Sequence, residues 1–147
     1  MEPLSLTCPV CGGALADAGG SFRCGAGHSF DKAKQGYVNL LLRAQSGGRR
    51  HGDDKRMVEA RRAFLDTGCY APLRDALCAM ALEFTAGPVR LLDAGCGEGY
   101  YTAAVADALR GAGRGCTAVG VDISKTALIA AARRRAELTL AVASVGA

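Results

Sequence analysis

Four residues near the N-terminus have the spacing of a metal site. Two cysteines stand two residues apart, twelve residues separate them from a third cysteine, and a histidine follows that cysteine after three more. The four are Cys8, Cys11, Cys24 and His28. Three thiolates and an imidazole nitrogen suit tetrahedral zinc, and four protein ligands leave no open position for water or substrate. The spacing therefore predicts a structural zinc ion, in preference to four unconnected residues.

A glycine-rich turn, DAGCGEG, forms a second candidate site after an apolar run. Glycines at this place let a ligand approach backbone N–H groups and a helix N-terminus, since no Cβ stands in the way. The third glycine comes one residue too early for a dinucleotide fingerprint, and the Gly-Lys-Ser/Thr of a P-loop is absent. The acidic start and compressed spacing are similar to the cofactor loop of S-adenosylmethionine-dependent methyltransferases. The candidate cofactor-binding residues here are Asp93, Gly95, Gly97, Glu98 and Gly99.

Asp122 supports the same ligand from the next strand-like run. It follows the apolar residues 117–121, at a place where a carboxylate can accept hydrogen bonds from both hydroxyls of a ribose. The turn and this acid together favour S-adenosylmethionine. A nicotinamide cofactor and a turn that binds nothing are the two alternatives.

Periodic segments that would position these residues begin after Asp53 and Asp54, either of which can cap a helix. Helices are predicted up to Gly68, from Pro72 to residue 86, over 103–109, and from Ser124 to Arg135; strands are predicted over 89–92, 117–121 and 138–143. Strand–helix–strand–helix–strand order predicts an α/β fold with a parallel sheet. On one face of the second helix lie the apolar residues Leu73, Ala76, Leu77, Met80 and Phe84.

Composition divides the chain into three parts. Residues 1–42 are rich in turn formers and are predicted to form a small lobe stabilised by zinc. Residues 43–55 are predicted to be a basic linker. Residues 56–147 are predicted to form a partial Rossmann-like domain with two leading helices and three strands. Nine of the 18 Lys and Arg residues lie within 31–62, together with four acidic residues. This excess of positive charge suits binding to a polyanion such as RNA, and the alternative is a solvated basic linker. No signal peptide or membrane-spanning run is seen, and seven cysteines, an odd number, indicate a reducing cytoplasm.

The blocks CPVC, CGAGHSFDKAKQGYVNLL, RRAFLDTGCYAPLRD, LLDAGCGEGYYT and GVDISK, in this order, resemble the bacterial large-subunit ribosomal RNA guanine-N1 methyltransferases. The resemblance implies a zinc-ribbon-like lobe that helps to grip RNA, followed by the first half of a Rossmann-like S-adenosylmethionine-dependent domain. It implies methyl transfer to ring nitrogen 1 of a hairpin guanine, zinc ligation by the four residues above, and donor contacts from Gly97, Glu98 and Tyr70.

This sequence departs from the family in length. The family's sheet has seven strands, and only three are predicted here, so the chain is expected to be truncated and to turn over weakly or not at all. The run 89–92 would then be an open sheet edge through which two copies could associate. No catalytic residue can be named. The alternative functions are a non-catalytic, zinc-stabilised RNA-binding module with a vestigial cofactor fold, and a methyltransferase acting on a small molecule or protein.

Overall fold

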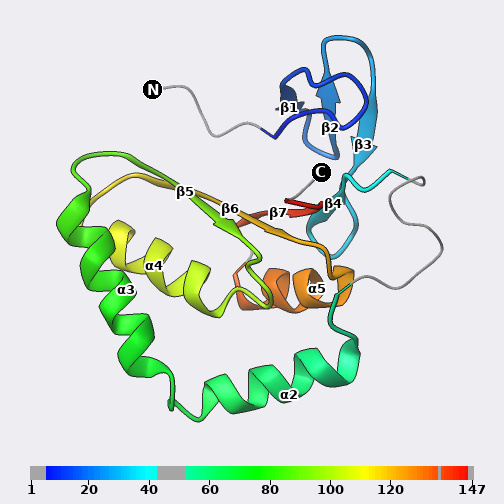
Figure 1. Cartoon of the computed structure of the whole chain (residues 1–147). Helices are drawn as coiled ribbons and strands as arrows, with labels where there is room; N and C mark the ends of the chain where they lie inside the picture. The colour runs from blue at the N-terminus through cyan, green and yellow to red at the C-terminus, as the bar shows by residue number, and fades with distance from the viewer. Residues whose placement is uncertain (1–5, 43–51, 136, 146–147) are drawn as a thin grey trace.

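The computed structural model describes residues 6–42, 52–135 and 137–145. Its N-terminal part is a small antiparallel sheet in the order β1-β2-β3, made of β1 (Leu15–Asp17), β2 (Ser21–Cys24) and β3 (Ser29–Asp31). Gly19 turns the chain between β1 and β2 with a φ of 83°, and Gly27 turns it between β2 and β3 with a φ of 89°, values that only glycine adopts readily. This lobe carries the cysteine and histidine cluster and is drawn in blue in Figure 1.

The second sheet is parallel, as the alternation of strands and helices predicts. It contains β4 (Tyr37–Asn39), β5 (Val89–Ala94), β6 (Cys116–Asp122) and β7 (Thr139–Val142), in the order β4-β7-β6-β5. The three strands expected from the sequence are confirmed, and β4 is a fourth that was not expected.

Strand β4 comes from the segment that the sequence assigned to the zinc lobe. Its Val38 is in register with Ala141 of β7, and the next ladder contact is a hydrogen bond from Leu40 N to Val142 O (2.8 Å). A three-residue strand is too short to show alternation in the sequence, which is why it was missed. Residues 37–39 thus belong to the parallel sheet, while the predicted domain boundaries stay a prediction.

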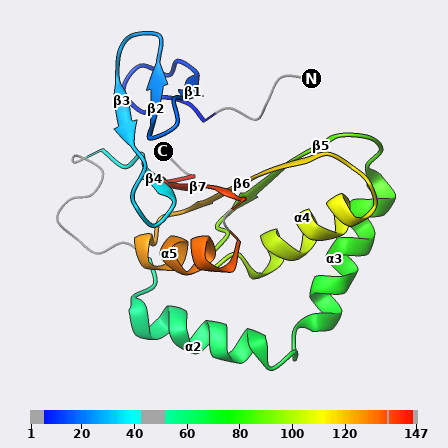
Figure 2. The same cartoon turned by 180° about the vertical axis from the view of Figure 1, so that it is seen from behind.

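Four helices lie on one side of this sheet, and the small lobe lies on the other (Figures 1 and 2). They are α2 (Lys55–Asp66), α3 (Ala71–Phe84), α4 (Tyr100–Gly111) and α5 (Lys125–Arg134). The Asp54 side chain caps α2 by accepting from Met57 N, and the Ser124 side chain caps α5 by accepting from Ala127 N, as expected. Helices α4 and α5 pack on the strands, α3 packs against α4, and α2 packs against α5.

Each face of the parallel sheet has its own hydrophobic core. On the helix side, Leu128 and Ala131 of α5 and Ala106 of α4 pack against Ala118 and Leu140 of the strands. On the other side the lobe and the sheet share a single cluster, formed by Cys8, Leu15, Phe22, Cys24, Val38, Leu40, Val119, Val121 and Ala141. The lobe therefore obtains part of its packing from the sheet and does not depend on a metal staple alone.

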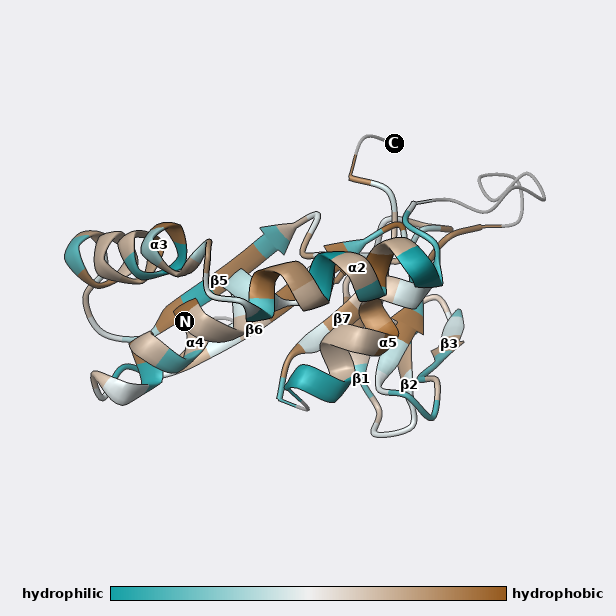
Figure 3. Ribbon diagram, turned by 90° about the horizontal axis from the view of Figure 1, so that it is seen from below, coloured by the Kyte–Doolittle hydropathy of each residue, from teal (hydrophilic) through white to brown (hydrophobic). Residues whose placement is uncertain are grey.

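The apolar stripe of α3 is not covered within the described residues. No residue of α3 is buried, and Leu73, Leu77, Met80 and Phe84 are all exposed, Phe84 to 75 %. Strand β5 lies at the end of the sheet order, as expected, and its Leu92 is 56 % exposed. Figure 3 shows hydrophobic colouring on both α3 and β5. Apolar side chains are therefore exposed both on α3 and on β5.

Candidate functional site

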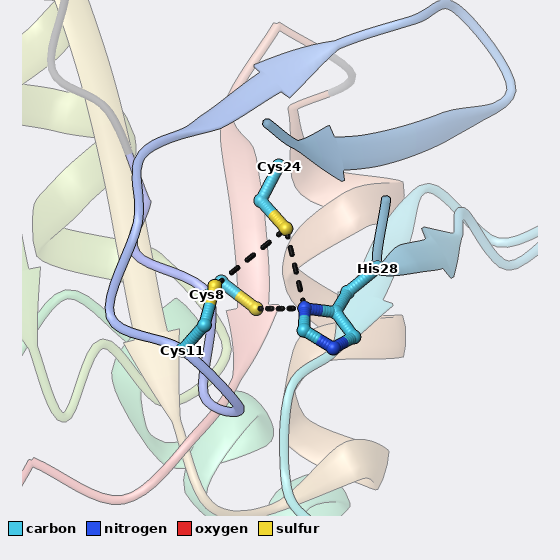
Figure 4. Close-up of side chains that lie close together, drawn as sticks. All are labelled: Cys8, Cys11, Cys24 and His28. Atoms are coloured by element: carbon cyan, nitrogen blue, oxygen red, sulfur yellow. Dashed lines mark hydrogen bonds between the residues drawn. The ribbon is translucent and has the colours of Figure 1, made fainter. Parts of the chain in front are cut away.

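The predicted zinc ligands converge in the lobe (Figure 4). Their ligand atoms all lie within 4.8 Å of one another, with the Cys11 and Cys24 Sγ atoms 3.7 Å apart and His28 Nδ1 3.3 Å from Cys24 Sγ and 3.6 Å from Cys8 Sγ. Tetrahedral zinc with Zn–S bonds of about 2.3 Å holds its sulfurs roughly 3.8 Å apart. The cluster therefore has the size and the donor set that zinc requires.

Two tight turns bring these ligands together. Gly12 N donates to Cys8 O (2.8 Å) in the first turn, and Gly27 N donates to Cys24 O (3.0 Å) in the second. Burial raises the pKa of the Cys24 thiol, but backbone and ring hydrogen bonds from His28 and a backbone hydrogen bond from Ala26 outweigh this and lower the pKa to about 6. These hydrogen bonds favour the thiolate form of Cys24, which is the form that binds metal.

The glycine turn of the parallel sheet is fixed to the end of β6 by its own backbone. Gly95 N and Cys96 N both donate to Val121 O (2.7 and 3.0 Å), and Gly97 N donates to Asp122 Oδ2 (2.9 Å). Gly99 N donates to Cys96 O (2.9 Å) inside the turn. These four amides are therefore used within the protein, which limits the backbone N–H groups that the turn can offer to a ligand.

Asp122 lies beside the turn, as its predicted role requires. Its Oδ2 accepts from Gly97 N, and its Oδ1 accepts from Ser124 N (2.7 Å), so the carboxylate braces both the turn and the start of α5. Each carboxylate oxygen has a second lone pair, which leaves capacity for a ribose hydroxyl. The bracing role could not be read from the sequence, because it depends on how strand ends align.

Two adjoining cavities open over this turn. The larger is about 290 Å³ and has aromatic walls that include Tyr70 and Tyr101; the smaller is about 190 Å³ and includes Asp122. Gly95, Gly97 and Arg61 line both. Gly95 and Gly97 have φ values of 89° and 55°, and a Cβ built on either would meet no atom within 4 Å, so it would project into open space. The turn thus presents an open cradle, and the residues present fit a bound cofactor.

Gly99, Asp93 and Tyr70, the other candidate cofactor-binding residues, contact neighbouring parts of the protein. Gly99 is needed for close packing, because a Cβ there would lie 3.2 Å from Ala131 Cβ of α5. Asp93 accepts a hydrogen bond from Thr102 Oγ1 and lines neither cavity. Tyr70 lines the larger cavity, and its ring packs edge-on against Phe64 at 5.6 Å.

Glu98 is buried and held by an arginine that the sequence analysis did not single out. Its side chain is 1 % exposed, and Arg134 of α5 donates to it from Nη2 and Nε at distances from 2.7 to 3.1 Å. Arg134 also reaches Asp66 of α2 (3.1 Å), so one guanidinium joins the glycine turn to α2 and α5. The pair is separated by 36 residues, and no local pattern announces it.

The remaining cysteines are not placed for chemistry. Burial and the negative charges of Asp93 and Asp122 raise the pKa of Cys96 to about 12, so its thiol is protonated and inert. Its sulfur packs so closely on β6 that a Cβ at Gly120 would lie 2.8 Å from it. Cys78 and Cys116 are half-buried, consistent with packing, whereas Cys69 is exposed.

Comparison with known proteins finds a similar family for each part of the chain. Residues 6–45 match the zinc-ribbon family model described as RlmA, N-terminal, and residues 87–146 match a family model described as methyltransferase domain. A 23S rRNA (guanine-N1)-methyltransferase of Micromonospora griseorubida is 43 % identical over 149 residues, which cover 87 % of this chain and 47 % of that protein. The 23S rRNA (guanine(748)-N1)-methyltransferase of Streptomyces fradiae is 38 % identical, over 95 % of this chain and 48 % of that protein.

The chain is homologous to these methyltransferases. A third relative, the 23S rRNA (guanine-N1)-methyltransferase YxjB of Bacillus subtilis (strain 168), is 33 % identical over 94 % of this chain and 49 % of its own length. The chain thus spans about half the length of the curated relatives that it matches. The zinc ribbon followed by a parallel α/β methyltransferase domain confirms the predicted fold class and the predicted family resemblance.

Proposed function

We propose that this chain binds S-adenosylmethionine over the glycine turn and supplies the donor-binding part of methyl transfer to ring nitrogen 1 of a guanine in large-subunit ribosomal RNA. The observation that carries the proposal is the pair of adjoining cavities above Gly95 and Gly97, with Asp122 at the side of one and Tyr70 at the side of the other. The names of the relatives support the reaction and the substrate.

The roles of the chain's own residues follow from this geometry. The positive φ values of Gly95 and Gly97 keep the floor of the cavities free of side chains. Asp122 would accept hydrogen bonds from the ribose, and Tyr70, the residue that precedes α3, would pack against the donor. S-adenosylmethionine supplies an electrophilic methyl group when it is bound. Glu98 acts through its ion pair with Arg134, which holds the turn in place, because its buried carboxylate already accepts from that guanidinium.

The zinc lobe contributes to RNA binding in this proposal. The lobe is fixed on the sheet face opposite the helices by the shared core, so an RNA held by the lobe would have a defined position relative to the cavities. The basic residues of 31–62 supply charge for phosphates. Residues 43–51 of that stretch lie outside the described residues. Among the described residues of the stretch, Arg61 pairs with Asp53 (2.7 Å), and Arg62 lies 3.7 Å from Asp66.

Calorimetric titration of the full chain with S-adenosylmethionine tests the proposal. Saturable binding is expected, and Gly97→Val should abolish it, because the new side chain would enter the cavities. The control is Gly113→Val, which introduces a similar strain at a φ of 74° with nothing within 4 Å and lies away from both cavities. Absence of binding by the wild-type chain, or equal loss in both variants, would rule out the site.

Turnover by the 147-residue chain alone is expected to be weak or absent, because the chain matches only about half of each relative. Transfer of radioactive methyl groups to ribosomal RNA measures this, and robust transfer would contradict it.

We also propose that the protein works in the cytoplasm and that two copies associate through β5. All seven cysteines are free, which suits a reducing compartment, and no helix in the described residues could span a membrane. Strand β5 is the last strand of the described sheet and presents Leu92. Sedimentation velocity should show a concentration-dependent dimer that Leu92→Lys weakens. Val10→Lys, at a residue of similar exposure in the lobe, should leave the dimer unchanged, and a monomer at all concentrations would refute the association.

A further inference from the structure

We infer that Arg61 binds the carboxylate at the amino-acid end of the methyl donor, with Asp53 beside it facing the ammonium group. This inference rests on the proposed function, since it assigns one end of S-adenosylmethionine to residues of α2 and its leading turn.

The first step is that four backbone amides of the glycine turn are already used within the protein. The amides of Gly95, Cys96, Gly97 and Gly99 donate to Val121 O, Asp122 Oδ2 and Cys96 O. An incoming carboxylate that lost its water without gaining donors would be strongly disfavoured. A basic side chain beside the turn would supply the hydrogen bonds that these four amides cannot give.

The second step is that Arg61 is placed to do so. It lines both cavities together with Gly95 and Gly97, so it lies where they adjoin. Among the described residues that line these two cavities it is the one with a positive charge, while Glu98, Asp53 and Asp122 are acidic. Arg134 neutralises Glu98 and lines neither cavity, so it does not compete for the role.

The third step concerns the state of the Arg61 side chain. It is 57 % exposed, so it can meet a ligand, and its Nη2 donates to Asp53 Oδ2 at 2.7 Å. A guanidinium has five N–H groups, and further ones can donate to a carboxylate while this bond persists. Asp53 is fixed in turn, because its backbone carbonyl accepts from Ser124 Oγ (2.7 Å) at the start of α5.

An arginine and an aspartate side by side complement a zwitterion. The amino-acid end of S-adenosylmethionine carries a carboxylate and an ammonium group on one carbon, which match Arg61 and Asp53 in charge and in order. With the ribose at Asp122 in the smaller cavity, an amino-acid end at Arg61 would lie next to the turn. The aromatic larger cavity would then be left beside the reacting methyl group.

Calorimetric titration of the full chain with S-adenosylmethionine and with its decarboxylated analogue tests this inference. Arg61→Gln should weaken S-adenosylmethionine binding about 10- to 100-fold, the range expected when a charged hydrogen-bond partner is lost. The same variant should change the affinity for the decarboxylated analogue by less than about 3-fold. Arg61→Lys should lie between the wild type and Arg61→Gln for S-adenosylmethionine, because it keeps the charge and loses the paired donors.

The matched control is Arg56→Gln, an exposed arginine of the same helix that lines neither cavity, and it should leave both affinities unchanged. Equal weakening of both ligands by Arg61→Gln, or no weakening of either, would overturn the inference while leaving the proposed function intact. Loss of RNA affinity with unchanged donor affinity would overturn it in favour of a phosphate contact. If the wild-type chain bound neither ligand, the proposed function itself would fail.

Discussion

Removal of Arg134 is expected to destabilise the protein strongly, because it would leave the Glu98 carboxylate buried without its partner. The change is Arg134→Met, which keeps most of the side-chain length and removes the guanidinium. Glu98 is 1 % exposed and accepts from both Nη2 and Nε of Arg134. After the substitution, the nearest described cation would be Arg62, whose Nε is 3.9 Å from Glu98 Oε2 and thus too far for a hydrogen bond.

The magnitude follows from the cost of breaking a buried ion pair, which is about 3–5 kcal/mol when one partner is removed. Arg134 is 21 % exposed, so some water can reach the carboxylate once the guanidinium has gone. The free energy of unfolding should therefore fall by about 3 kcal/mol, at the lower end of that range. For a chain of this length the melting temperature should fall by roughly 6–12 °C.

Urea denaturation followed by circular dichroism measures the change. Glu98→Gln should cost less than Arg134→Met, because a neutral amide is easier to bury than an unpaired carboxylate. The double variant should be more stable than the sum of the two single losses predicts, with a coupling energy of about 2 kcal/mol. Arg133→Met is the control, since the neighbouring arginine of α5 is exposed.

A loss below about 1 kcal/mol for Arg134→Met would refute the reasoning, as it would place this pair among surface ion pairs of small effect. Additive losses in the double variant would also refute it, because they would show that the two side chains stabilise the protein independently.

Three further predictions concern the metal site, the packing of the parallel sheet, and the contact between Ser124 at the start of α5 and Asp53 before α2. Cys24→Ser should abolish stoichiometric zinc measured by mass spectrometry and lower the melting temperature, since zinc binding contributes folding free energy, whereas Cys69→Ser at an exposed cysteine should change neither. Gly120→Ala should lower the free energy of unfolding, measured by urea denaturation, by about 1–3 kcal/mol, because the new Cβ would lie 2.8 Å from Cys96 Sγ and 3.0 Å from Leu140 Cδ2. The control is Gly111→Ala, which has open space around it and should leave the stability unchanged or raise it. Equal effects of the two substitutions would contradict the packing argument. Ser124→Ala should lower the free energy of unfolding, measured in the same way, by about 1–2 kcal/mol, because the α5 cap and the hydrogen bond to Asp53 O are both lost. Thr126→Ala in the same helix should lower it by less.

The sequence predicted those parts of the fold that rest on local rules. Metal-ligand spacing identified the four residues of the lobe, and capping residues located the starts of α2 and α5, because each signal lies within a few residues. The glycine turn was recognisable for the same reason, since three glycines with positive φ stand within five positions.

Contacts between distant segments could not be predicted in this way. The pairing of Val38 with Ala141 joins segments about a hundred residues apart, and three residues are too few to show a period. The partner of Glu98 could not be predicted either, because three consecutive arginines stand at the end of α5. Only the folded structure shows that the middle one, Arg134, contacts both Asp66 of α2 and Glu98. The exposure of α3 was unexpected for a related reason: an apolar stripe predicts a buried face only when another element covers it.

Strand β7 lies between the core shared with the zinc lobe and the core that includes the glycine turn. Ala141 on one side belongs to the core shared with Cys8 and Cys24, and Leu140 on the other side packs with Cys96 of the glycine turn. A metal ion that orders the lobe also restrains this strand, and a donor bound at the turn restrains it from the opposite face. By thermodynamic linkage, zinc occupancy should raise the affinity for the donor, and the bound donor should raise the affinity for zinc by the same factor.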